Sequence, residues 1–159
     1  MNSIRGHIHH ATLFVAISLL PACAGTKVYP NNLAKNLEIR TTTKSDSMLL
    51  RVGASVHVHR VIGPCATEYL GTVELDRKTT PIGIPVGKPS YLEVVFANSG
   101  VLGGYQSATS EGMVLTPRHG YRYRIDASYV DSLYSVVISE MPPGSTRVKE
   151  IPAKRLSGC

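Results

Sequence analysis

The sequence predicts an all-β protein, an antiparallel immunoglobulin-like or transthyretin-like sandwich of about seven or eight strands, with a small β-barrel as the alternative. Short apolar runs are separated by turn residues at intervals of roughly ten residues, and no long segment has the helical period of about 3.6 residues. The composition agrees, because the chain has no Trp, two Phe and eight Tyr, and takes its other large apolar residues mainly from Val, Leu and Ile. A length of 159 residues accommodates one domain.

The N-terminal residues 1–22 have the layout of a signal peptide. Arg5 lies near the start, an almost unbroken apolar run extends from Ala11 to Leu20, and the small residue Ala22 precedes Cys23. A bilayer-spanning helix needs about 20 apolar residues, so this run is too short to cross a membrane. We therefore expect residues 1–22 to be removed on export rather than to form a buried helix or strand of the domain.

The sequence Leu20-Pro21-Ala22-Cys23 resembles the lipobox of bacterial lipoproteins. The resemblance implies that the leader is cut before Cys23 and that the Cys23 thiol carries a diacylglycerol, which anchors the mature chain without a transmembrane helix. In that family an Asp after the cysteine favours the inner membrane, so Ala24 favours the outer membrane, facing the periplasm. Cleavage by an ordinary signal peptidase, with Cys23 free or disulfide-bonded, is the alternative.

The mature chain is expected to contain a lipidated N-terminus and tether (23–47), a sandwich domain (48–142) and a C-terminal tail (143–159). The tether is rich in Lys, Asn, Thr, Ser and Gly and has no sustained periodicity, which is typical of a linker. Its candidate strand is Asn36 to Arg40.

The strands expected in the domain follow one another at short intervals. The clearest pattern is Val56-His57-Val58-His59, where strict alternation places both Val on one face and both His on the other. Pro and Gly between Ile82 and Val86 predict an edge or irregular strand, because Pro lacks the N–H that an interior ladder uses. Residues 98–112, rich in Gly and Ser, predict a long loop. The other expected strands are 48–52, 54–62, 67–75, a central strand over 90–97, and a hairpin of 121–128 and 133–141 that turns at Val130-Asp131-Ser132.

Two cysteines remain once Cys23 is lipidated. Cys65 and Cys159 form an even pair in an oxidising compartment, which predicts a disulfide that ties the C-terminal tail back to the domain. Two free thiols, or an intermolecular bridge through Cys159, are the alternatives.

A pair of histidines is the main candidate for binding chemistry. His57 and His59 project side by side from one strand and could hold two corners of a transition-metal site, with His119 as a possible third ligand. The competing interpretation is a solvated strand face, because an alternating strand must place polar residues outward. All three histidines are therefore weak candidates, and the sequence implies no cofactor.

The sequence contains no pattern that predicts catalysis or nucleotide binding. A Gly-x-Ser-x-Gly elbow is absent, and Gly103-Gly104 precedes no predicted helix, so neither a serine nucleophile nor a phosphate cradle is indicated. The net charge of +6 is spread along the chain without a dense basic run, which gives no support to nucleic-acid binding.

These observations predict a lipid-anchored, non-catalytic cell-envelope protein that acts as an interaction or structural module. Its expected partners are the membrane, through Cys23, and an envelope protein. The alternatives are a periplasmic metal- or ligand-binding protein that uses His57 and His59, and a hydrolase whose site is assembled from loops.

Overall fold

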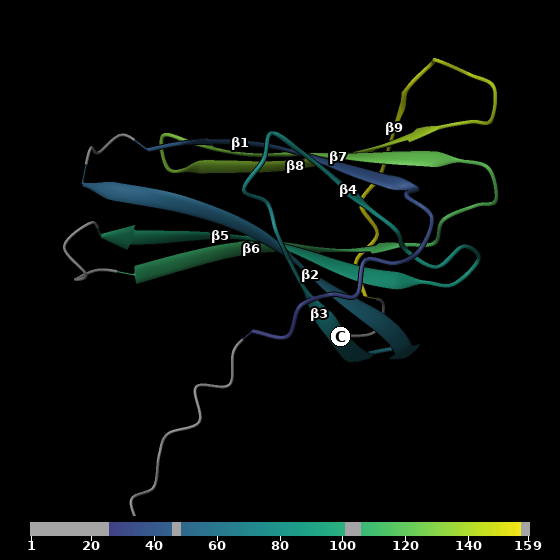
Figure 1. The fold of residues 1–159 in the computed structure, drawn as a ribbon, viewed down its shortest axis with the longest axis horizontal. Coiled ribbons are helices and arrows are strands. Elements are labelled where there is room, and N and C mark those ends of the chain that lie inside the picture. Colours follow the sequence, from purple (N-terminus) through teal and green to yellow (C-terminus); the bar gives the residue numbers. More distant parts are fainter. Residues whose placement is uncertain (1–25, 46–48, 101–105, 157–159) are drawn as a thin grey trace, which may run out of the picture.

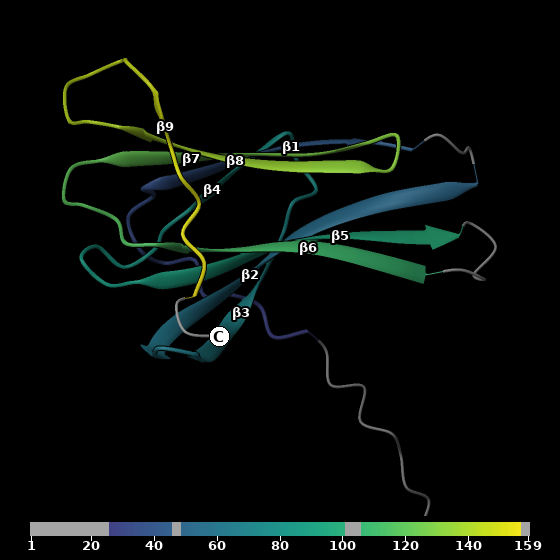
Figure 2. The ribbon, with the colours of Figure 1, turned by 180° about the vertical axis from the view of Figure 1, so that it is seen from behind.

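The computed structural model describes residues 26–45, 49–100 and 106–156, and these form two stacked β-sheets (Figures 1 and 2). One sheet has five strands in the order β4-β1-β7-β8-β9, and the other has four in the order β3-β2-β5-β6. The strands are β1 (Leu37–Lys44), β2 (Leu50–Gly63), β3 (Ala66–Glu74), β4 (Thr79–Ile82), β5 (Ser90–Gly100), β6 (Gln106–Leu115), β7 (Arg122–Val130), β8 (Leu133–Met141) and β9 (Lys149–Ile151). The predicted sandwich is confirmed, and the alternative of a small closed barrel is not, because each sheet keeps two edge strands.

The core lies between the sheets and is built by alternation along the strands. Strand β2 turns Val56 and Val58 inward, and β5 turns Leu92, Val94 and Phe96 inward. Burying one such side chain contributes about 1.5–3 kcal/mol, so the facing rows of apolar residues account for most of what holds the layers together. No helix among the described residues is long and apolar enough to cross a membrane.

The chain joins the sandwich earlier than the sequence predicts. The Tyr29 N–H donates to the Thr72 carbonyl (2.9 Å), and the Thr72 N–H donates to the Lys27 carbonyl (2.8 Å), so the N-terminal segment lies against β3 (Figure 1). Tyr29 is buried, and its hydroxyl donates to the Gly83 carbonyl (2.8 Å).

Strand β1 is an interior strand between β4 and β7, and it pairs with β7 in parallel. The predicted tether over 23–47 is therefore wrong for Lys27 to Lys44. Only Leu37 and Ile39 of this strand are buried, and a run with two apolar residues among polar ones resembles a linker in sequence.

The expected loop over 98–112 is also wrong for its described part. Strand β5 continues to Gly100 and β6 begins at Gln106, so most of the range forms a hairpin. Packing explains one glycine of this range, Gly112. The Tyr91 phenol lies over Gly112, and a Cβ at this position would overlap the Tyr91 hydroxyl. The runs expected as separate strands, 48–52 and 54–62, form the single strand β2 from Leu50 onward.

The edge strand expected between Ile82 and Val86 lies earlier in the chain. Strand β4 is an edge strand and contains Pro81, whose missing N–H is tolerated there, but it ends at Ile82, and residues 83–86 are not in a strand. The predicted β7–β8 hairpin is confirmed. The β7–β8 hairpin turns at Asp131 and Ser132, whose φ angles of 50° and 66° are those of a two-residue type I′ turn.

The described part of the C-terminal tail is attached by backbone pairing. Strand β9 pairs with β8, and beyond it the Val114 N–H donates to the Lys154 carbonyl (2.6 Å). The tail thus runs from the five-stranded sheet to the β6 edge of the four-stranded sheet (Figure 2).

Candidate functional site

The outer face of the four-stranded sheet carries the predicted histidine pair. The alternation of β2 turns His57 and His59 away from the core, as the sequence predicts. The register then places His57 opposite Glu93 of β5 and Thr72 of β3. His59 lies opposite Tyr91 and Tyr69 on the same two strands.

His57, His59 and Glu93 form a compact group of possible ligands. One ligand atom from each of the three residues lies within 4.8 Å of the others, and all three side chains are half-buried. His57 Nδ1 is 3.4 Å from Glu93 Oε2, while the second carboxylate oxygen, Oε1, accepts a hydrogen bond from the Ser110 hydroxyl (2.8 Å). The carboxylate is thus held by β6 on one side and faces the imidazoles on the other.

His59 lies between two tyrosine rings. Its ring centroid is 5.3 Å from that of Tyr69 and 5.4 Å from that of Tyr91, so the two phenols flank the imidazole. Nδ1 is 3.4 Å from the Thr67 hydroxyl oxygen, whereas Nε2 is buried and has no hydrogen-bond partner among the described residues. If Nδ1–H donates to Thr67, the lone pair lies on Nε2.

Burial and nearby charges set the protonation of these groups. Burial lowers the pKa of His59 below its ordinary value, and nearby His57 adds to this, while the negative charge of Glu93 opposes it. The pKa of Tyr91 is raised, first by burial and then by Glu93 and Glu111, which keeps its phenol protonated. At neutral pH His59 is therefore a neutral imidazole.

Two imidazole nitrogens and a carboxylate oxygen are a donor set that suits divalent transition metals. The sequence predicts His57 and His59 correctly as neighbours on one face, but the third candidate ligand is Glu93. His119 lies in the exposed connection before β7 and is not part of this group. Alternation over residues 90–97 puts Glu93 outward, but the pairing of β5 with β2 cannot be read from the sequence.

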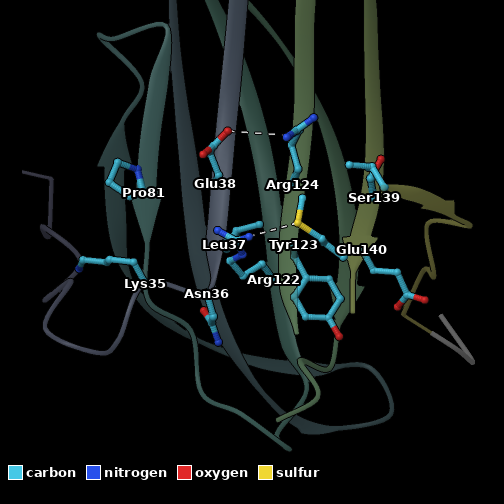
Figure 3. Close-up of a pocket in the computed structure, with 12 residues that line it drawn as sticks. Lys35, Asn36, Leu37, Glu38, Pro81, Arg122, Tyr123, Arg124, Ser139 and Glu140 are labelled. Atoms are coloured by element: carbon cyan, nitrogen blue, oxygen red, sulfur yellow. Dashed lines mark hydrogen bonds and ion pairs between the residues drawn. The ribbon is translucent and has the colours of Figure 1, made fainter. Parts of the chain in front are cut away.

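A pocket lies on the five-stranded sheet, away from the histidine group. It is lined by β1, β7 and β8 and contains Arg122 and Arg124 (Figure 3). Arg124 Nε is 3.8 Å from Glu38 Oε1, and Arg122 Nη2 lies 3.3 Å from the Met141 sulfur (Figure 3). Tyr123 is buried, whereas Arg122 is exposed and Arg124 is half-buried, so β7 turns its tyrosine toward the core and its arginines outward.

The cysteines are only partly described. Cys65 lies in the turn between β2 and β3 and is disulfide-bonded. Cys23 and Cys159 both lie outside the described residues, so the lipidation of Cys23 and the pairing of Cys65 with Cys159 stay predictions.

Comparisons with known proteins give no family for this chain. No protein-family model matches the sequence, and no curated protein matches it.

Proposed function

We propose that the chain is a lipid-anchored, non-catalytic protein of the cell envelope, whose sandwich is an interaction or structural module held at the outer membrane and facing the periplasm. Its anchor is the lipid on Cys23, in the lipobox-like sequence that ends at that residue. The disulfide between Cys65 and Cys159 belongs to the same proposal, because it leaves the Cys23 thiol free to receive the diacylglycerol.

The observation that carries this proposal is the lipobox-like sequence Leu20-Pro21-Ala22-Cys23, and the early start of the fold sets how far the domain can lie from the anchor. Hydrogen bonds to Thr72 fix the chain from Lys27 onward, and Lys27 is four residues after Cys23. Four residues span at most about 14 Å when fully extended. A lipid on Cys23 would hold the β3 side of the sandwich close to the bilayer surface, instead of letting the domain move on a long tether.

The charge of the mature chain fits such a position. Removal of residues 1–22 takes away Arg5 alone among the charged residues, so 17 − 1 = 16 Lys and Arg face 11 Asp and Glu, a net charge of +5. A basic domain tethered this close to anionic headgroups is attracted to them, which adds to the lipid anchor.

Metabolic labelling with palmitate tests the anchor. The full-length chain, expressed in a diderm bacterium, is expected to incorporate the label and to sediment with membranes. Cys23→Ser should abolish both, whereas the matched control Cys159→Ser should keep both. Equal labelling of Cys23→Ser and the unchanged protein would overturn the proposal.

A further inference from the structure

The arrangement of His57, His59 and Glu93 is fixed by backbone pairing. The three residues lie on adjacent strands in the middle of the four-stranded sheet, and β2 and β5 are paired over most of their length. His57 lies directly opposite Glu93, and His59 follows two residues later on the same face. Their proximity therefore does not depend on a loop conformation.

An ordinary ion pair explains only part of this group. His57 Nδ1 lies 3.4 Å from Glu93 Oε2, and the Ser110 hydroxyl donates to the second carboxylate oxygen, Oε1. His59 Nε2 is left buried without a partner among the described residues. A buried polar atom without a hydrogen bond costs about 1–3 kcal/mol, so a ligand for this nitrogen would be stabilising.

We propose that His57, His59 and Glu93 bind one divalent transition-metal ion, of the class to which Zn²⁺ and Cu²⁺ belong. Imidazole nitrogen and carboxylate oxygen are the donors that these ions accept. With bonds of about 2.0–2.2 Å, two tetrahedral ligand atoms lie about 3.4 Å apart. The His57 Nδ1 to Glu93 Oε2 distance of 3.4 Å already has this value.

The residues around the group have the arrangement that supports metal ligands in proteins. Ser110 holds the carboxylate of Glu93, and Thr67 lies at Nδ1 of His59, so both ligands would be oriented by a second residue. Tyr69 and Tyr91 limit the rotation of the His59 ring. Three protein ligands leave a further coordination position for water or a small ligand.

This proposal is independent of the lipid anchor. The three ligands lie on β2 and β5, and none of them belongs to the N-terminal segment. Loss of membrane attachment would leave the metal site intact, and loss of the site would leave the anchor intact.

Isothermal titration calorimetry of the full chain in detergent, purified without a histidine tag and stripped with a chelator, tests the site. Zn²⁺ and Cu²⁺ are titrated separately, and for Cu²⁺ electron paramagnetic resonance reports nitrogen coordination. We expect one equivalent of at least one ion to bind. The paired change His57→Ala with His59→Ala should weaken that binding at least 100-fold, whereas the matched control His119→Ala should leave it unchanged.

Glu93→Gln keeps the size of the side chain and removes its charge, so it guards against loss of fold. It should weaken binding about tenfold or more while metal-free thermal unfolding remains cooperative. The proposal is overturned if neither ion binds stoichiometrically, or if Glu93→Gln and the double histidine variant bind as tightly as the unchanged protein.

Discussion

Gly112 leaves the space that the Tyr91 ring occupies beside the candidate site. The Tyr91 phenol lies over Gly112, and from there the Tyr91 ring contacts His59 from one side. Nothing in a Gly within a Ser- and Gly-rich segment reveals this, because the cross-strand neighbour is known only once β5 and β6 are paired. Gly53, also inside a strand, can take a Cβ without a clash, because the nearest neighbour, the Ala97 carbonyl oxygen, would lie 3.9 Å from it, an ordinary van der Waals contact.

The two glycines therefore predict different responses to the same substitution. Gly112→Ala should lower the free energy of unfolding by about 1–3 kcal/mol, because Tyr91 must move out of its position. Gly53→Ala should leave it nearly unchanged. Urea unfolding of both variants measures the difference, and equal stabilities would show that Tyr91 does not pack on Gly112.

At the scale of the strands, the alternation of apolar and polar residues was the reliable predictor of strand position and facing. It predicted the inward Val and outward His of β2, and the β7–β8 hairpin with its turn at Asp131 and Ser132. It failed for β6, and the candidate strand Asn36 to Arg40 covered only the first half of β1, because a strand with few apolar residues is recognised only through its partners. Glu93 was missed for the same physical reason, since which strands pair depends on the whole fold.

The N-terminal segment gives the clearest test at this scale. A tether would be insensitive to mutation, but Tyr29 is buried and donates a hydrogen bond to Gly83. Near pH 7, Tyr29→Phe should lower the free energy of unfolding by about 0.5–1.5 kcal/mol. No change at neutral pH would mean that this segment is a linker after all.

The same variant has a predicted pH dependence. Burial raises the pKa of Tyr29 above its ordinary value of 10.0, so the unfolded chain loses this proton at a lower pH than the folded protein does. The contribution of Tyr29 to stability is complete below about pH 10 and is lost as the pH rises through the raised pKa. Above pH 10 the stability difference between the two proteins should therefore shrink in urea unfolding. A constant difference would contradict this.

At the scale of the whole molecule, the disulfide partner of Cys65 decides whether Cys23 is available to carry a lipid. The chain has three cysteines and Cys65 is disulfide-bonded, so within one chain its partner is Cys23 or Cys159. A Cys23 whose sulfur carries a diacylglycerol cannot also form a disulfide. The lipid anchor therefore requires the pairing of Cys65 with Cys159.

Peptide mapping under non-reducing conditions should recover this pair. Cys159→Ser should then lower the free energy of unfolding by up to about 4–5 kcal/mol, as expected for opening a loop of roughly 95 residues. Recovery of a peptide that joins Cys65 to Cys23 would exclude the lipid anchor.

The most direct measurement of the anchor itself is the mass of the N-terminal peptide of the protein purified from membranes. We expect this peptide to begin at Cys23 and to carry the added mass of a diacylglycerol, with or without a further acyl group on its amine. A peptide that begins at Met1, or at an unmodified Cys23, would contradict the account.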